Sequence, residues 1–222
     1  MKSSGEGFDH IGIPGGIKPG EPEKFEFLYG GSQQKWHIRM LLAAEYFGSW
    51  SKCMSRQIGA TIVRDKTILA TGYNGPPRGV PECHTEARYD QVVKILRKNP
   101  NWHSDPTTLR RLKEQWGTNC PRRLLEFGSG TGLELCPAGH AESNAIANAA
   151  REGVRIVDAD MYCWCPLPCM NCAKMIIGAG IKCVFYRSGP DYDADSRWML
   201  MNAGVSIVGI TDEFIEKYRQ AL

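Results

Sequence analysis

The sequence predicts an α/β fold that opens with an antiparallel hairpin and continues as alternating helices and strands. Two short β-rich runs, 58–63 and 67–71, flank Arg64-Asp65-Lys66, a pattern typical of a hairpin. From residue 140 to the C-terminus, helical and strand patterns alternate, which implies parallel strands with helices packed on the sheet. With 222 residues, 42% of them hydrophobic, the chain is long enough to bury a core of its own.

The first half of the chain supplies one helix, the hairpin and an insertion. Residues 33–50 are predicted to form a helix because apolar side chains recur there at helical spacing. The apolar positions are Trp36, Met40, Ala44 and Phe47. The run Gly72-Tyr73-Asn74-Gly75-Pro76-Pro77 then ends the second strand. Residues 78–135 are predicted to be an insertion that carries two helices, around 92–96 and 109–116.

The second half contains the strand and helix alternation. The predicted elements are helix 140–152, strand 160–164, helix 169–179, strand 182–187, helix 194–202, strand 205–210 and helix 212–222. Gly153 and Gly180 end the first two of these helices, as glycine commonly does just after a helix. The glycine-rich run 128–132 is predicted to be a flexible loop rather than a phosphate cradle, because no strand precedes it and no Gly-Lys-Ser/Thr follows.

Composition limits the classes of function. Residues 1–32 are rich in glycine and proline and are expected to form a flexible arm before a single domain at 33–222. No signal peptide or membrane span is evident, so we expect a soluble, cytoplasmic protein. The net charge is only +3, with 27 basic and 24 acidic residues, which makes a nucleic-acid partner unlikely. Nine cysteines, several crowded between 163 and 172, suggest metal ligation rather than disulfides.

Two short segments carry groups with an affinity for zinc, and each opens a predicted helix. They are His140-Ala141-Glu142 and Pro168-Cys169-Met170-Asn171-Cys172. Cysteines three apart on a helix project within about 60° of each other, and the helix N-terminus favours their thiolates. His140 supplies a third ligand, which leaves the fourth tetrahedral position for water, as a catalytic zinc requires.

Glu142 is the predicted catalytic residue. It is too near His140 in the sequence to be a comfortable ligand, but it can reach a water at the open position, take its proton and deliver it to a leaving amine. The combination of His-x-Glu and Pro-Cys-x-x-Cys is the pattern of zinc nucleobase deaminases. Each half alone is less specific, because a lone Cys-x-x-Cys is often a structural zinc knuckle or a redox pair.

Both zinc segments resemble the deoxycytidylate (dCMP) deaminase branch of the cytidine deaminase superfamily. The runs 140–153 and 168–181 are similar to that family's two zinc helices, and Ser51-Lys-Cys and Thr71-Gly-Tyr-Asn-Gly are similar to its opening segments. The likeness covers about 35–83 and 136–210. It implies a three-layer α/β/α cytidine-deaminase-like sandwich with a mixed five-stranded sheet. The run 163–168 is one residue longer than the family's strand-to-helix link.

The resemblance further implies hydrolysis of dCMP to dUMP and ammonia. By this likeness, Asn74 of this chain would contact the nucleotide and Tyr186 would pack against base or sugar. Ser55 and Arg56 would meet the 5′-phosphate. A second, structural zinc on Cys53, Cys83, Cys136 and His84 is implied by the same likeness, as are a homo-oligomer and the effectors dCTP and dTTP. The residues alone leave other interpretations open. Asn74 could be a turn residue, Tyr186 a half-buried strand tyrosine and Arg56 a solvated surface charge. The cysteines of the second site could be free thiols.

Other substrates and one other class of protein compete with this hypothesis. A related deaminase could act on dCTP, a 5-modified deoxycytidylate, a free nucleoside or a free base, and the insertion at 78–135 could change that specificity. A non-catalytic zinc-dependent nucleic-acid-binding module would share the fold. Intact Glu142 argues against such a module because binding alone needs no proton shuttle, and the near-neutral charge argues against it as well.

Overall fold

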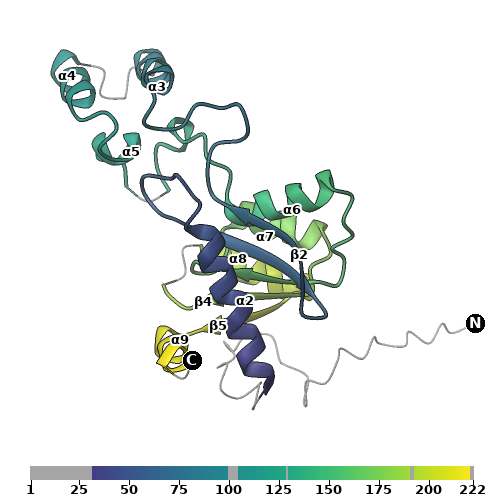
Figure 1. The fold of residues 1–222 in the computed structure, drawn as a ribbon. Helices are drawn as coiled ribbons and strands as arrows, with labels where there is room; N and C mark the ends of the chain where they lie inside the picture. The colour runs from purple at the N-terminus through teal and green to yellow at the C-terminus, as the bar shows by residue number, and fades with distance from the viewer. Residues whose placement is uncertain (1–31, 100–104, 129, 191–192, 221–222) are drawn as a thin grey trace, which may run out of the picture.

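A mixed five-stranded sheet forms the centre of the molecule (Figure 1). The computed structural model describes residues 32–99, 105–128, 130–190 and 193–220. The strands are β1 (Gly59–Arg64), β2 (Thr67–Tyr73), β3 (Asp160–Cys163), β4 (Cys183–Arg187) and β5 (Ser206–Ile210). They lie in the order β2-β1-β3-β4-β5, with β1 antiparallel to both neighbours and β3, β4 and β5 parallel. The predicted hairpin and the predicted parallel strands are both confirmed.

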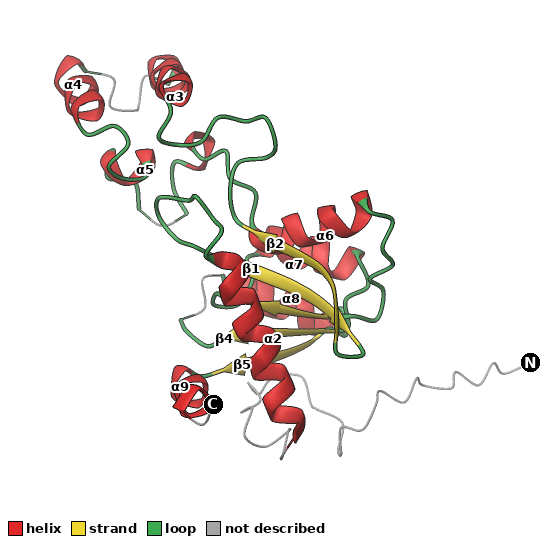
Figure 2. Cartoon of the chain, viewed as in Figure 1, coloured by secondary structure: helices red, strands yellow, loops and turns green. Residues whose placement is uncertain are grey.

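Helices cover both faces of this sheet and complete the three-layer sandwich (Figure 2). On one face lie α2 (Ser32–Gly48) and α9 (Asp212–Gln220); on the other lie α6 (Ala141–Arg151), α7 (Met170–Gly178) and α8 (Ala194–Asn202). Each face has its own apolar core. Ile38, Phe185 and Ile215 belong to the first core, and Ala145, Ile176 and Leu200 to the second. All of the predicted helices and strands of the second half are present, within two residues at each end.

Helix α2 is present, and of the four apolar positions expected to face the sheet only Ala44 is fully buried. Ile38, Leu41 and Ala44 are buried against the sheet, whereas Trp36 and Met40 are only half-buried. Trp36 lies at the side of the helix, where the Lys66 Nζ is 5.1 Å from its ring centroid. The helix has two overlapping apolar stripes, and periodicity alone does not say which one faces the sheet. Tertiary contact with the sheet selects the stripe of branched aliphatic side chains.

The insertion forms a separate helical lobe that projects from the sandwich (Figures 1 and 2). It contains α3 (Glu86–Lys98), α4 (Pro106–Glu114), α5 (Pro121–Leu124) and the 3-10 turn η1 (Leu133–Leu135). Its small core is built by the buried side chains of Val92, Leu96, Leu112, Leu125 and Leu135. The two predicted helices are confirmed, and α5 was missed because one turn carries no periodic pattern.

Close backbone packing joins α6 to the hairpin. A methyl group on Gly72 would lie 2.2 Å from the Ala141 carbonyl oxygen and 2.4 Å from the Ala145 nitrogen, so only glycine fits there. Two side chains of α6 reinforce the contact: the Asn144 amide donates to the Tyr73 carbonyl and the Asn148 amide to the Thr71 carbonyl, both at 2.8 Å. The first turn of α6 is thereby held at one end of β2.

None of the nine cysteines forms a disulfide bond. No helix in the described part of the chain is both long and apolar enough to cross a membrane. The predicted N-terminal arm lies outside the described residues, apart from Ser32.

Asp160 makes the stability of the fold depend on pH. Burial at the start of β3 raises the pKa of its carboxyl from 3.8 to about 6, and Lys182, with Nζ at 3.9 Å, offsets this only in part. The folded state therefore binds the proton more tightly than the unfolded state, and stability falls as pH rises from about 4 to about 6. Asp160→Asn should raise the free energy of unfolding by about 2 kcal/mol at pH 8, and the gain should shrink toward pH 4. Urea denaturation at both pH values measures this; a less stable variant at pH 8 would show that the Lys182 attraction outweighs burial.

Candidate metal centre and active site

The first metal-binding segment is held by the end of the hairpin. Gly75 and Gly139 form a two-way backbone bridge, with N–H to carbonyl distances of 3.1 and 2.9 Å. His140 follows directly as the N-cap residue of α6, and Glu142 lies in the first helical turn. The bridge therefore places both side chains at the end of the sheet where β2 finishes.

The second segment begins α7. Cys169 is the N-cap residue, and Cys172 lies in the first turn. The Asp193 carboxylate accepts a hydrogen bond from the Met170 backbone N–H at 2.9 Å and so caps this helix from another part of the chain. Both cysteines thus sit where the N-terminal end of the helix favours thiolates.

The donor atoms of His140, Cys169 and Cys172 converge. Each sulfur lies 3.4 Å from the His140 Nδ1, and all three donors are within 4.8 Å of one another. A tetrahedral zinc with bonds of about 2.3 Å to sulfur and about 2.0 Å to nitrogen separates such donors by about 3.5 Å. The residues present therefore fit a zinc ion with three protein ligands. No other group of three donors in the described residues is gathered this closely.

The electrostatics of the three donors also suit a cation. A hydrogen bond from Cys172, helped by one from His140, lowers the pKa of Cys169 to about 4, so this sulfur is a thiolate at neutral pH. The same hydrogen bond raises the pKa of Cys172, and a hydrogen bond with Cys169 raises the pKa of His140. A divalent cation bound here would favour the deprotonated form of each donor.

Glu142 is buried beside these donors, with only 4% of its surface exposed. Burial raises the pKa of its carboxyl, and the nearby His140 opposes that shift. The Cys165 thiol donates to the Glu142 Oε1 at 3.9 Å. Sequence reasoning assigned Cys165 no role, although the extra residue in the 163–168 link marked this segment as unusual.

One cavity contains Glu142, His140 and Cys169, and it extends to the insertion. Ser55, Arg56 and Asn74 line it, as sequence reasoning placed them, although the contacts expected of them stay predictions. The Asn74 amide is largely engaged in holding the preceding loop: its Oδ1 accepts from the Ile58 N–H and its Nδ2 donates to the Arg56 carbonyl, both at 2.9 Å.

Tyr186 does not line the cavity. It is buried in the core beneath α8, and its hydroxyl accepts a hydrogen bond from Arg197 at 3.0 Å. Its expected contact with the nucleotide stays a prediction that this arrangement does not support directly.

Cys53, Cys83 and Cys136, the cysteines expected to hold a second zinc, lie in one region of the molecule, but their sulfur atoms are not gathered as closely as the donors of the first site. Cys53 and Cys136 line the cavity together with Cys120, a residue to which sequence reasoning gave no role. Burial, then the neighbouring Cys120, raises the pKa of Cys83 to about 11, and Cys136 and Cys53 add to the effect. His84 is exposed, and its Nδ1 lies 3.6 Å from a Glu82 carboxylate oxygen. Cys120 is therefore a better placed companion than His84.

The mixed sheet brings a His/Cys/Cys donor set next to a buried glutamate in a cavity. This arrangement is typical of a zinc-dependent hydrolase domain. Residues 32–188 match the family model of the cytidine and deoxycytidylate deaminase zinc-binding region. The chain belongs to this family. The predicted resemblance and the predicted fold are both confirmed.

The chain is similar to several members of that family. It is 30% identical over 172 residues to the deoxycytidylate deaminases of Schizosaccharomyces pombe and Saccharomyces cerevisiae, covering 78% of this chain and 43% and 44% of theirs. It thus spans less than half the length of these two relatives. It is 32% identical over 170 residues to the enzyme of Enterobacteria phage T2, covering 72% of this chain and 84% of that one. The apo dCMP deaminase of cyanophage S-TIM5 superposes with a TM-score of 0.51 at 25% identity, covering 81% of this chain and 99% of that one.

Removal of one donor tests the metal centre. Cys172→Ser should lower the bound zinc by one ion per chain relative to the wild type, because a serine hydroxyl is a poor replacement for a thiolate ligand. Glu142→Gln is the matched control and should keep the wild-type zinc content, since Glu142 is not among the converging donors. Metal analysis of the purified proteins measures both. Unchanged zinc in the Cys172 variant would contradict the assigned ligands.

Proposed function

We propose that this chain hydrolyses the amino group of a deoxycytidine nucleotide, converting dCMP and water to dUMP and ammonia. The observation that carries the proposal is the buried Glu142 next to the three converging donors, in a cavity that several segments of the chain line. Relatives named deoxycytidylate deaminase and the S-TIM5 enzyme crystallised with dCMP and dUMP support this substrate. We propose His140, Cys169 and Cys172 as the ligands of the catalytic zinc.

Zinc bound there would supply a Lewis acid that activates water at neutral pH. Glu142 then has the task of moving protons. As a carboxylate it accepts a proton from the attacking water, whose oxygen bonds to C4 of the base. As an acid it delivers that proton to the exocyclic nitrogen, so that the C4–N bond breaks and ammonia leaves. Its raised pKa suits both roles, because a buried carboxyl gains and loses a proton closer to neutral pH.

The groups around the cavity suit a nucleotide. We propose that Ser55 and Arg56 meet the 5′-phosphate and that Asn74 contacts the sugar or base with the hydrogen-bonding capacity that remains after its two backbone contacts. Tyr186 would then support the pocket from the core, in place of direct packing on the base.

Glu142→Gln tests the mechanism. The variant should lose at least about 10²- to 10⁴-fold in kcat for dCMP, because the amide can neither take nor deliver the proton. Ammonia release by the zinc-loaded variant, compared with zinc-loaded wild type, measures the loss. Near-normal turnover by the variant would contradict the role of Glu142.

Comparison of substrates tests the nucleotide class. We expect kcat/KM for deoxycytidine to be roughly 10²-fold or more below that for dCMP, because cationic groups meant for a phosphate would be left without it. The same ammonia assay should include dCTP, 5-substituted deoxycytidylates and cytosine. A preference for one of these would replace dCMP as the substrate, and equal rates with deoxycytidine would remove the phosphate requirement.

We also propose a second, structural zinc held by Cys53, Cys83, Cys120 and Cys136, with Cys120 in the place first expected for His84. A buried arginine supports it. Arg88 is only 1% exposed, its Nε has no hydrogen-bond partner, and its other nitrogens reach the Gln91 Oε1 and the Leu135 carbonyl. A buried cation without a carboxylate calls for nearby negative charge, and zinc with four thiolates carries a net charge of about −2.

Zinc stoichiometry tests the second site. Wild-type protein should carry two zinc ions per chain, and Cys120→Ser should carry one. Cys165→Ser is the matched control and should keep two, because this thiol faces Glu142 instead. A wild type with a single zinc would contradict the proposal.

We further propose a homo-oligomer regulated by dCTP and dTTP. Beside the Gly72–Gly75 loop lies an aromatic surface of Tyr46, Phe47, Trp50 and Tyr73, of which Trp50 is 52% exposed, and such a patch suits a subunit contact. Light scattering should find an oligomer, and the Trp50→Ala substitution should dissociate it. If dCTP and dTTP prefer different conformations of the protein, each should change the dCMP saturation curve. A wild-type monomer with hyperbolic kinetics would overturn this proposal and leave the catalytic one standing.

A further inference from the structure

The cavity that contains Glu142 has a cationic side supplied in part by the insertion. Arg56, from the loop before β1, lines it together with Arg122 and Arg123 of α5. Among the lining residues Glu142 is the sole acid. The cavity therefore joins one proton-transfer group to three guanidinium groups that come from two distant parts of the chain.

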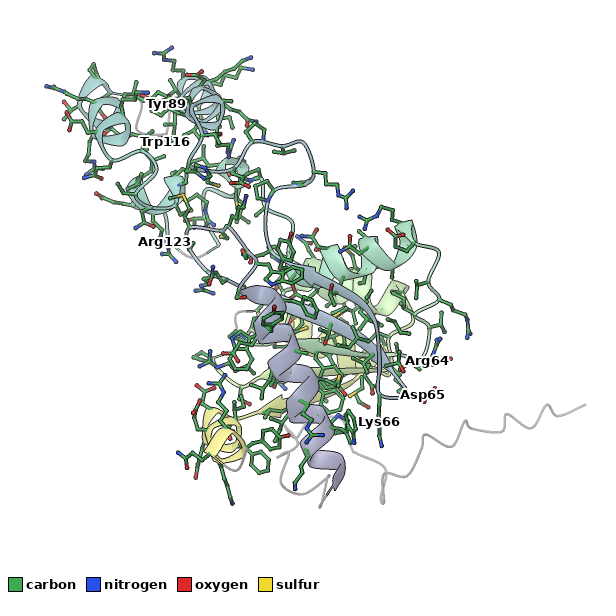
Figure 3. All side chains as sticks on the ribbon, viewed as in Figure 1. Arg64, Asp65, Lys66, Tyr89, Trp116 and Arg123 are labelled. Carbon is green, nitrogen blue, oxygen red and sulfur yellow. The ribbon has the colours of Figure 1, made fainter. Side chains whose placement is uncertain are left out.

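Arg122 and Arg123 differ in what they already bind. Arg122 donates from Nε to the Thr131 carbonyl at 2.7 Å and from a terminal nitrogen to the Gly128 carbonyl at 3.1 Å, so it holds a loop of the insertion. The Arg123 side chain is exposed and makes no ion pair or hydrogen bond with any described residue, whereas its backbone N–H and carbonyl are bonded within the α5 turn. The nearby acid Glu126 is paired with Arg111 at 2.9 Å and does not neutralise it. In Figure 3, Arg123 points from α5 toward the sandwich rather than toward the outer helices of the lobe.

The insertion holds Arg123 in place through its core. Pro121 at the first position of α5 is buried, as is Cys120 before it. Leu125, just after the helix, is buried in the small core of the lobe. The backbone on both sides of Arg123 is thus anchored, which lowers the ordering cost of binding a ligand through this side chain.

We propose that Arg123 of the insertion, together with Arg56, binds the 5′-phosphate of the nucleotide substrate, so that the insertion determines specificity for phosphorylated substrates. This inference rests on the proposed deamination of a deoxycytidine nucleotide and adds a residue of the insertion to the phosphate contacts proposed for Ser55 and Arg56. A phosphate monoester carries a charge of about −1.5 to −2 at pH 7, which two guanidinium groups match. The base end of the nucleotide then faces Glu142, and the phosphate end faces α5.

The inference is tested by equilibrium binding, which needs no turnover. Zinc-loaded Glu142→Gln protein serves as the background, and dissociation constants for dCMP, dCTP and deoxycytidine are measured by calorimetry. Adding Arg123→Ala should weaken dCMP binding about 10- to 100-fold, the effect of losing a charge-assisted hydrogen bond, and should change deoxycytidine binding less than about twofold. Arg123→Lys should be intermediate, because it keeps the charge and loses the planar fork.

Arg110→Ala is the matched control, since Arg110 is an exposed arginine of the same lobe that does not line the cavity. It should bind all three ligands as the background protein does. Equal loss of dCMP and deoxycytidine in the Arg123 variants would indicate a general effect on the cavity and would overturn the phosphate role. Unchanged nucleotide binding by Arg123→Ala would overturn it as well. Failure of wild-type protein to release ammonia from dCMP would overturn the proposed substrate, and the binding comparison would still decide the role of Arg123.

Discussion

Helix α6 lies in backbone contact with strand β2, and the position of the active site follows from that contact. Gly72 leaves no side chain between helix and strand, while Asn144 and Asn148 bind carbonyl groups of the strand. Because β2 is at the edge of the sheet, these amides also satisfy acceptors that no further strand pairs with. The start of α6, with His140 and Glu142, is therefore held where the start of α7 can meet it.

The charges of the side chains at the starts of α6 and α7 influence one another. His140, Cys169, Cys172 and the buried Glu142 carboxyl share a small volume of low dielectric. A divalent cation bound there would stabilise the thiolates of both cysteines. Glu142 is left as the titratable group that faces the cavity. The same burial that makes an unpaired charge costly here thus supports both metal binding and proton transfer.

The insertion has an apolar core of its own and also lines the cavity that contains Glu142. Its apolar core is separate from the two cores of the sandwich, yet its inner surface contributes Cys120, Arg122 and Arg123 to the catalytic cavity. Arg88 is buried in this lobe near Cys83, whose thiol it affects electrostatically. Under the proposals above, a structural metal would secure the lobe to the loop that carries Cys53, and the same lobe would present an arginine to the phosphate.

Local patterns in the sequence predicted most of the helices and strands and the donors His140, Cys169 and Cys172, because helix periodicity, β-rich runs and residue spacing depend only on nearby residues. Only the tertiary structure shows which side chains of α2 are buried, that Cys120 lies near Cys83, and that Arg123 lines the cavity. These facts depend on contacts between segments far apart in the chain, and local periodicity carries no information about which distant side chains share a space.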